Sequence, residues 1–522
     1  MVIQAGVSMK KAFPFLPFAT AALVTVGLLQ ADQTNEIGKL LADDATPKDL
    51  LGSAVAVSGS IVAVGAEGDD QNGPLAGSAY TFDLSTGQQL AKLIPNTGSV
   101  FDLFGCSIGV SGTTVIVGVR GDDDNGTESG SAYLYDAITG QELAHIFPND
   151  GMAYDQFGSA VAVDGTTAVI GAFANSDLGT SAGAAYLFDT VTGQQLMKLT
   201  ASDGAAGDQF GIAVAIEGSN LVVGNSGNNL GAVYLFDTLT GQEKAKFMAS
   251  DGVLGDLFGE KIAISGNTLI VGACRHGLGG AAYLFDLTTS LELHKLVSND
   301  IAMDDEFGSS VAIDGTIAIV GAEQDDDFGS YSGSAYVFDS LTGVQTAKLL
   351  PSDGVSSDRF GQRVAIVGST ALIGSPDSDE GFVDAGAVYI FDAATPSGLA
   401  STLVRNGSGS NAMILASRTN PVLGATWDSD LDCTGHSPSF ASIEVYSQPF
   451  GGFFLSGGEL LVDVTSPLLA RAISIHYGNV LTFSLSIPPD GSLCGMTASA
   501  QGGVLGLPGF DLSNAIDLVL GY

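Results

Sequence analysis

Short runs in which apolar and polar residues alternate, each about the length of one β-strand, cover most of the chain. In one stretch these runs are Ser107–Val110, Thr114–Val119, Ser131–Asp136 and Glu142–Phe147. Turn residues such as Ser111-Gly112 separate them. The spacing leaves no room for long crossover helices, so the pattern predicts four antiparallel strands joined by short connections.

The four-strand unit recurs seven times, at intervals of about fifty residues. Each unit opens on the sequence Asp-x-Phe-Gly, with Asp49-Leu50-Leu51-Gly52 as a degenerate first copy. The later copies span 102–105, 155–158, 208–211, 256–259, 305–308 and 358–361. Seven units of four antiparallel strands predict an all-β fold, a seven-bladed β-propeller over residues 32–394. The repeated phenylalanine is expected to wedge between blades, and the aspartate to accept N–H groups of its own loop.

The two ends of the repeat region predict how the ring closes. Residues 36–41 (EIGKLL) have the pattern of a fourth strand but precede the first unit. The seventh unit runs from Phe391-Asp392 into Pro396 without a clear fourth strand. We therefore expect the N-terminal strand to complete the last blade and to cover the two open sheet edges.

The repeat resembles a known family. Its recurring positions resemble those of the FG-GAP repeat, as in Phe104-Gly105, Val117-Gly118-Val119 and Ser131-Ala132-Tyr133. That repeat is known from the propeller of integrin alpha chains and from secreted bacterial proteins. The resemblance covers residues 36–394 and implies an extracellular binding protein. Integrin-type repeats carry calcium ligands between the first two strands, where this chain has only tight turns such as Val57–Ile61. Those calcium sites do not carry over.

Charge and the N-terminus narrow the class further. The 522 residues include 18 basic and 57 acidic ones, a formal charge of −39, which argues against nucleic acid as a partner. Lys10 and Lys11 precede an apolar stretch, Ala12–Leu29, so residues 1–31 are predicted to be a signal peptide. No later segment is apolar enough to span a membrane. The mature protein is expected to be secreted or held at the cell surface, without a transmembrane segment.

In an up-and-down blade of strands A to D, the B–C and D–A loops share one face, and here these loops are the long, acidic ones. The acids cluster in blades 6, 7, 1 and 2, which are neighbours in a closed ring. Solvated charge, Ca²⁺ binding and attraction of a basic partner are three open interpretations of this crescent. The candidate Ca²⁺ ligands are Asp69, Asp70, Asp122, Asp123, Asp124, Asp325, Asp326, Asp327, Asp377 and Asp379.

Sequence signals for catalysis are weak. Ser107 stands in a Gly-x-Ser-x-Gly match but falls inside a predicted strand, not on a nucleophile elbow. His276 is the histidine expected on the B–C/D–A face. Glu260 and Lys261 replace the small residues usual after Phe-Gly, and are expected to line the channel or pair in its wall. No catalytic residue is assigned.

Residues 395–522 lie beyond the repeat and alternate in runs such as Ser442–Tyr446 and Ala472–His476, which predict a small β-sandwich-like module. Its two cysteines, Cys433 and Cys494, are candidates for a disulfide.

Taken alone, the sequence predicts a non-enzymatic propeller that presents its B–C and D–A loop face to an extracellular protein or glycan, with Ca²⁺ as an open cofactor. Two alternatives stay open. One is an extracellular glycan hydrolase that uses carboxylates at the channel mouth, and the other is a passive cell-surface structural protein.

Overall fold

The computed structural model describes residues 36–227 and 230–393, and ten strands, β29–β38, within the C-terminal segment. All of the regular structure in this part of the chain is β-strand. None of the described residues forms a helix of the length and apolar character that crossing a membrane requires. The predicted signal peptide, residues 1–31, and both Cys433 and Cys494 lie outside the described residues.

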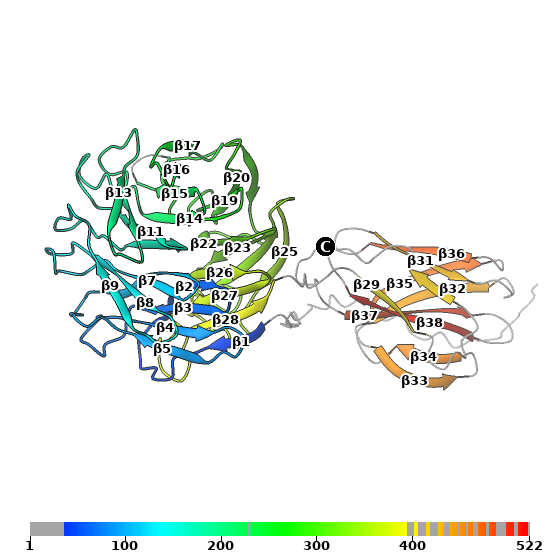
Figure 1. Ribbon diagram of the computed structural model, residues 1–522. Helices are drawn as coiled ribbons and strands as arrows, with labels where there is room; N and C mark the ends of the chain where they lie inside the picture. The colour runs from blue at the N-terminus through cyan, green and yellow to red at the C-terminus, as the bar shows by residue number, and fades with distance from the viewer. Residues whose placement is uncertain are drawn as a thin grey trace, which may run out of the picture.

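Seven four-stranded antiparallel sheets form the ring seen in Figure 1, and each sheet is one predicted unit. Blade 1 is β2 (Leu51–Ser58), β3 (Ile61–Ala66), β4 (Ser78–Asp83) and β5 (Gln89–Leu93). Blade 2 is β6 (Phe104–Ser111), β7 (Thr114–Val119), β8 (Ser131–Asp136) and β9 (Glu142–Ile146). Blade 3 is β10 (Ala160–Asp164), β11 (Thr167–Ala172), β12 (Ala184–Asp189) and β13 (Gln195–Leu199). Blade 4 is β14 (Ala213–Glu217), β15 (Asn220–Asn225), β16 (Ala232–Asp237) and β17 (Glu243–Phe247).

The remaining blades continue the same order. Blade 5 is β18 (Ile262–Ser265), β19 (Thr268–Ala273), β20 (Ala281–Asp286) and β21 (Glu292–Leu296). Blade 6 is β22 (Phe307–Asp314), β23 (Ile317–Ala322), β24 (Ser334–Asp339) and β25 (Val344–Leu349). Blade 7 is β26 (Arg363–Val367), β27 (Thr370–Ser375), β28 (Ala387–Asp392) and β1 (Glu36–Leu40). The predicted seven-bladed propeller is thus confirmed.

The predicted closure of the ring is confirmed as well. β1, blue in Figure 1, lies beside the yellow β28 and pairs with it antiparallel, with Lys39 opposite Tyr389. Leu51, which stands where later units have phenylalanine, donates its N–H to Ala385 O of blade 7 at 3.0 Å. The innermost strands of successive blades neighbour one another around the whole ring, from β2 to β26 and back to β2. Each innermost strand therefore lies between those of the two adjacent blades.

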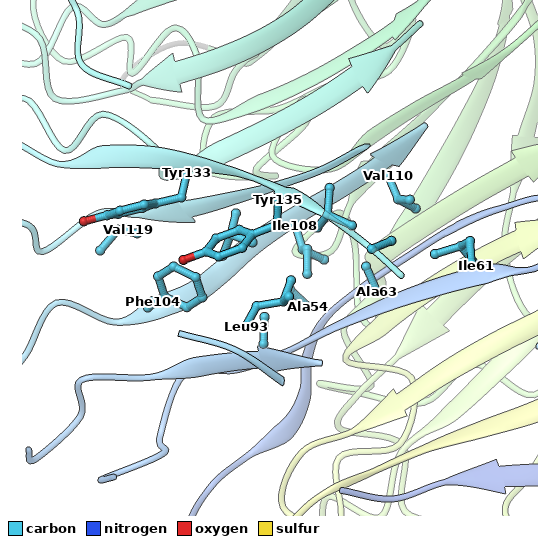
Figure 2. Packing of buried hydrophobic residues seen from close by; sticks show 14 residues of the cluster. Ala54, Ile61, Ala63, Leu93, Phe104, Ile108, Val110, Val119, Tyr133 and Tyr135 are labelled. Atoms are coloured by element: carbon cyan, nitrogen blue, oxygen red, sulfur yellow. The ribbon is translucent and has the colours of Figure 1, made fainter. Parts of the chain in front are cut away.

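The repeated Phe-Gly pair joins neighbouring blades, as expected. Phe104 is fully buried in a cluster with Ala63 and Leu93 of blade 1 and with Tyr133 and Tyr135 of blade 2, as Figure 2 shows. Its ring lies 5.6 Å from Tyr133 and 5.9 Å from Tyr135, in tilted and edge-on contacts that aromatic pairs favour. This packing explains why the position is phenylalanine in six units and the apolar Leu51 in the first.

Strand A of blade 2 begins earlier than the sequence pattern predicts, at Phe104 and not at Ser107. The register shifts between Phe104 and Ser107, because Gly105 adopts a φ of +90° and inserts a bulge. The alternation of apolar and polar residues is interrupted at a bulge, so the sequence pattern does not reveal the first residues of this strand.

Ten strands follow in the C-terminal segment: β29 (Ser401–Arg405), β30 (Ile414–Ser417), β31 (Thr426–Asp432), β32 (Ser439–Tyr446), β33 (Pro449–Leu455), β34 (Gly458–Val462), β35 (Leu468–His476), β36 (Val480–Ser486), β37 (Thr497–Leu505) and β38 (Phe510–Val519). They pair as a five-stranded, a three-stranded and a two-stranded sheet. Predicted strands such as Ser442–Tyr446 and Ala472–His476 fall within these elements. The sandwich arrangement stays a prediction.

Candidate functional site

The B–C and D–A loops meet on one face and are bonded to each other between neighbouring units. Phe101, in the D–A loop that enters blade 2, donates its N–H to Pro74 O in the B–C loop of blade 1 at 2.9 Å. Tyr154 donates to Thr127 O of blade 2 at 2.7 Å in the same way. Paired loops of this kind form a continuous and rigid surface, the loop face.

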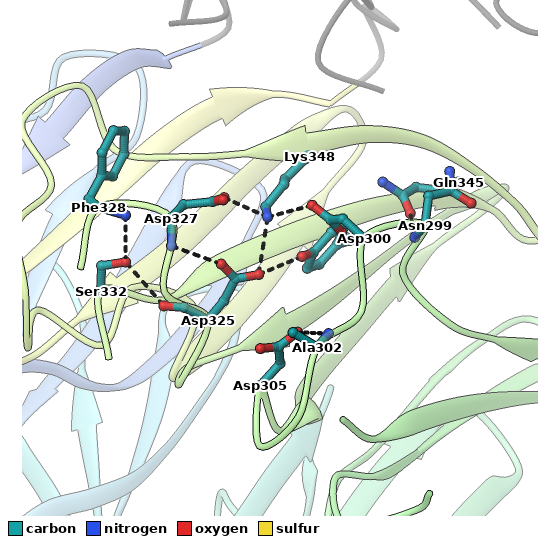
Figure 3. A network of polar contacts seen from close by, with 11 residues as sticks. Asn299, Asp300, Ala302, Asp305, Asp325, Asp327, Phe328, Ser332, Gln345 and Lys348 are labelled. Carbon is teal, nitrogen blue, oxygen red and sulfur yellow. Dashed lines mark hydrogen bonds and ion pairs between the residues drawn. The ribbon is translucent and has the colours of Figure 1, made fainter. Parts of the chain in front are cut away.

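Beneath the loop face, blade 6 holds a lysine among carboxylates (Figure 3). Lys348 Nζ lies 2.7 Å from Asp300 Oδ2, 3.0 Å from Asp325 Oδ2 and 2.5 Å from Asp327 Oδ2. It also lies 5.1 Å from the ring centre of Tyr336, whose hydroxyl donates to Asp325 at 2.7 Å. Burial opposes the charged form of Lys348, but Tyr336 and the three carboxylates outweigh it and raise the pKa of this amine. Lys348 is therefore a permanent internal cation.

The same arrangement, here called the lysine cage, occurs in six blades. The lysine of the fourth strand always stands directly opposite the tyrosine of the third strand, so both side chains point to the same side of the sheet. A carboxylate from the D–A loop completes each cage, and in five of the six the B–C loop contributes an acid or a histidine as well. The lysines and their acidic partners are Lys39 (Asp353, Glu380), Lys92 (Asp44, Asp69), Lys198 (Asp150, Asp177), Lys246 (Asp203), Lys295 (Asp251) and Lys348 (Asp300, Asp325, Asp327).

Blade 2 differs from the other six blades at two positions of the lysine cage. His145 stands opposite Tyr133, in the place of the lysine, and Thr97 takes the place of the D–A aspartate. The imidazole stacks on Tyr133 with ring centres 3.8 Å apart, and Thr97 Oγ1 lies 3.0 Å from the Tyr133 hydroxyl. The B–C loop acids Asp122 and Asp124 remain. Blade 2 thus keeps these carboxylates without the internal cation.

The candidate Ca²⁺ ligands separate into three structural roles. The first acid of each loop, Asp69, Asp122 or Asp325, is buried and accepts hydrogen bonds from its own blade. The second acid closes the loop by accepting the N–H five residues further on; these residues are Asp70, Asp123, Asp326 and Asp379. The third acid, Asp124 or Asp327, lies beside the first, whereas Asp377 pairs with Arg359 at 3.2 Å.

The close groups of acids form within single blades. Among the described residues, two groups of three side chains could place their ligand atoms around one ion: Asp122, Asp124 and His145, and Asp300, Asp325 and Asp327. Lys348 already lies within the second group. The Ca²⁺ prediction stays a prediction.

Sequence reasoning missed the lysines, the D–A aspartates and His145. A signal was available, because in five units the lysine recurs at the same distance after the tyrosine, whereas blade 2 has His145 at that distance and blade 7 takes Lys39 from the N-terminal strand. Lysine in a strand usually indicates a solvated edge, so the recurring lysine does not by itself indicate a partly buried contact with carboxylates.

The aspartate of the repeated Asp-x-Phe-Gly motif accepts a backbone N–H of its own loop, as expected. Asp102 accepts from Ser99 at 2.5 Å and Asp358 from Val355 at 2.8 Å. Burial, together with neighbouring acids such as Asp122 or Asp379, raises the pKa of each to about 6. Both groups therefore titrate within the ordinary range of working pH.

These two aspartates predict a pH dependence of stability. A carboxyl whose folded pKa is about 6, above an unfolded value of about 3.9, stabilises the fold below the unfolded pKa and loses that contribution as pH rises through 6. We expect the melting temperature to fall between pH 5 and pH 7.5. Replacing Asp102 and Asp358 with asparagine keeps an acceptor for the loop N–H and should flatten this dependence in calorimetry. An unchanged slope in the double variant would contradict the assignment.

The other candidates for chemistry are engaged in the structure. The Ser107 hydroxyl donates to Gly158 O of the next blade at 2.7 Å, so it ties blades together. Burial raises the pKa of the Cys106 thiol to about 11 and that of Cys274 to about 12. His276 Nδ1 lies 2.8 Å from Asp256 and its Nε2 lies 2.7 Å from Lys295 Nζ, within the cage of blade 5.

The residues after Phe-Gly in blade 5 form an ion pair. Lys261 Nζ lies 3.5 Å from Glu260 Oε1, and both side chains are half-buried. Burial and the charge of Arg363 lower the pKa of Lys261. The expected pairing in the wall of the inner strands is thereby supported for Glu260 and Lys261.

Large apolar side chains stand exposed on the loop face, where the D–A loops carry two of them in several blades. Phe101 and Tyr154 are each 60% exposed, and Val100 and Met152 beside them are 51% and 63% exposed. Further members are Val253, Leu254, Ile301, Met303, Val355, Phe382 and Val383. The C–D turns of the opposite face also expose large apolar side chains, such as Val191 and Leu239, but the exposed aromatic ones among the described residues, Phe101, Tyr154, Tyr331 and Phe382, all belong to the loop face. Exposed aromatic groups of this size are typical of a binding surface.

The repeat architecture, its inter-blade Phe-Gly pairs and its loop face together define a seven-bladed β-propeller of the FG-GAP class. The FG-GAP repeat family pattern matches residues 34–82, 88–135, 141–188, 194–236, 242–285, 291–338 and 344–391, which together are more than half of the chain. The chain belongs to the FG-GAP repeat family. The integrin-like and secreted-type details remain expectations.

No curated protein matches this chain at a significant level. Among solved structures, the chain is similar to the Dos1 propeller, with 14% identity over 64% of this chain and 74% of the other and a TM-score of 0.39. It is also similar to a europium-containing methanol dehydrogenase (11% identity, 71% and 81% covered, TM-score 0.40). A third similar structure is the dihydro-heme d1 dehydrogenase NirN in complex with DHE (15%, 69% and 64%, TM-score 0.39). At these identities and TM-scores the comparison carries no functional conclusion.

Proposed function

We propose that this protein is a secreted, non-enzymatic binding propeller whose loop face contacts an extracellular protein or glycan. The observation that carries the proposal is the conformation of two exposed aromatic residues. Phe101 and Tyr154 have φ values of +67° and +70°, a region that costs a bulky residue about 1–3 kcal/mol. The same position is Lys48, Asp304 or Ser357 in blades 1, 6 and 7, with φ values of +70°, +68° and +76°, and it is Gly207 or Gly255 in blades 4 and 5. The fold therefore accepts glycine, polar and charged residues there, so folding does not require the aromatic side chains of blades 2 and 3.

The chemistry of the loop face suits binding better than catalysis. Aromatic side chains on a rigid backbone stack on sugar rings or enter apolar pockets of a protein, and they lose little conformational freedom on doing so. The carboxylates next to them are tied to lysines in six of the seven blades, so few ionisable groups of the described face are left to move protons. Export through the predicted signal peptide would place this face outside the cell.

Substitution of the aromatic pair tests the proposal. A variant with Phe101→Ser and Tyr154→Ser is expected to lose at least tenfold in affinity for any glycan or extracellular protein that the wild type binds on arrays. A matched control, Val191→Ser with Leu239→Ser, removes two exposed apolar residues from the opposite, C–D turn side of the ring and should bind normally. Equal binding by both variants would contradict the proposal.

The second candidate is a glycan hydrolase, and one observation favours it. Burial and the charge of Glu323 raise the pKa of Glu306, the residue directly before strand A of blade 6. A raised carboxyl pKa is one requirement of a general acid. Turnover of a polysaccharide that is lost in Glu306→Gln would establish this function in place of binding alone. If the protein neither binds nor cleaves any partner tested, the passive structural interpretation is the one that remains.

A further inference from the structure

Blade 2 keeps the anionic half of the lysine cage and lacks its cation. Asp122 and Asp124 correspond to Asp325 and Asp327 of blade 6, and the N–H of the later acid donates to Oδ1 of the earlier one in both blades, at 2.7 Å and 3.2 Å. His145 corresponds to Lys348, because each stands opposite the tyrosine of its third strand. The repeat therefore holds a lysine amine at this place in six blades, and in blade 2 an imidazole stands beside the two carboxylates instead.

The blade 2 side chains are arranged as ligands. One oxygen of Asp122, one of Asp124 and one nitrogen of His145 all lie within 4.8 Å of one another. Donors around a tetrahedral zinc ion stand about 3.4 Å apart, so shifts of well under 1 Å per donor, on the order of a side-chain adjustment, would bring them into place.

His145 supplies an observation independent of the acids. Its Nε2 is shielded from solvent and forms no hydrogen bond, and it lies 3.4 Å from Asp122 Oδ2. The imidazole is clamped between Tyr133, at 3.8 Å between ring centres, and Phe147, at 4.1 Å. The hydroxyl of Ser131 holds Asp122 through a 2.5 Å hydrogen bond. A buried nitrogen without a hydrogen bond, in a ring packed against two aromatic side chains and facing a hydrogen-bonded carboxylate, is the arrangement of a metal ligand with its supporting contacts.

We propose that Asp122, Asp124 and His145 bind one divalent transition-metal ion, with zinc as its representative, in the place that a lysine amine fills in the other blades. One imidazole and two carboxylates are a donor set that zinc accepts, whereas Ca²⁺ takes oxygen ligands only. Two formal negative charges match a divalent cation. Three protein ligands leave a position for water or for a donor from a bound molecule. This site does not depend on the function proposed above, since it rests on other residues of blade 2.

The test converts blade 2 into a lysine cage. The double variant Thr97→Asp and His145→Lys restores the two residues found in blade 6 and should fold, because six blades already use that combination. Isothermal titration of the purified, tag-free protein with zinc chloride should show one site in the wild type, and binding at least tenfold weaker in the double variant. Asp124→Asn, which removes one donor, should weaken binding too. Asp123→Asn is the matched control, because Asp123 only closes the loop, and it should bind zinc normally.

Three results would overturn the proposal. One is the absence of zinc binding at up to about 100-fold excess in the wild type, and the second is equal affinity in the Thr97→Asp and His145→Lys variant. The third is a Ca²⁺ site that binds more tightly than zinc and persists without His145, which would make this an oxygen-only site. If the double variant fails to melt cooperatively, the contrast between Asp124→Asn and Asp123→Asn decides the question alone.

Discussion

Replacing Lys348 with methionine is expected to destabilise the propeller by about 3–5 kcal/mol, the usual consequence of removing one partner from a buried charge cluster. The Lys348 side chain is only 18% exposed and its amine contacts three carboxylates, and Asp325 itself is almost fully buried. Methionine fills most of the volume but leaves Asp300, Asp325 and Asp327 facing one another without a cation. Thermal and urea unfolding of the purified protein would measure the change.

Lys244→Met is the matched control for this prediction. Lys244 also pairs with an aspartate, Asp237, at 2.9 Å, but its side chain is 36% exposed and Asp237 lies at the surface turn. Exposed pairs contribute little to stability, so this variant should unfold almost as the wild type does. Adding Asp325→Asn and Asp327→Asn to Lys348→Met should recover part of the loss. If Lys348→Met and Lys244→Met unfold alike, the lysine cages are not what holds the loop face.

Gly158→Ala is expected to have the second large effect, a loss of more than about 4 kcal/mol or failure to fold. Gly158 belongs to the Phe-Gly pair of blade 3 and has a φ of +88°. A Cβ atom there would lie 2.1 Å from Ser131 O and 2.9 Å from Val119 N, both backbone atoms of blade 2. Backbone cannot yield as a flexible side chain does, so the two blades would have to separate.

The Gly165→Ala variant separates the cost of a steric clash from the cost of a left-handed backbone conformation. Gly165 lies in the A–B turn of the same blade with a φ of +56°, and nothing stands within 4 Å of its added Cβ. Only the cost of a left-handed alanine, about 1 kcal/mol, is expected. Soluble yield and melting temperature would compare the two variants. A Gly158→Ala protein that melts within two or three degrees of Gly165→Ala would refute the close approach of the blades.

The fold could be predicted from the sequence because each repeated residue has one structural reason. Phe104 and its equivalents are needed at blade contacts, and Gly105 and its equivalents at bulges against the neighbouring backbone, so both recur with the period of the blade. The closing strand was recognisable because EIGKLL has the pattern of a fourth strand, including the lysine that proves to stand opposite Tyr389. What could not be foreseen was the exact start of strand A, because the bulge breaks its alternation.

The candidate site was predicted only in part. The acidic loops could be assigned to one face from strand order alone. Their partners were missed, although the lysine recurs with the repeat, because it lies in the fourth strand and the D–A aspartate that it contacts comes from a loop 48 residues earlier, as in Asp300 and Lys348. The positive φ of Phe101 and Tyr154 is likewise a property of the folded loop, although glycine at the corresponding positions of blades 4 and 5 is a hint in the sequence.

Binding by the loop face is the central claim, and an array experiment tests it most directly. The purified protein, its Phe101→Ser and Tyr154→Ser variant and the Val191→Ser and Leu239→Ser control would be applied to arrays of glycans and extracellular proteins, with bound partners checked for cleavage. We predict a partner that is bound without turnover by the wild type and the control, and at least tenfold more weakly by the Phe101 and Tyr154 variant. Binding that survives in that variant but fails in the control, or cleavage of the partner, would contradict the account.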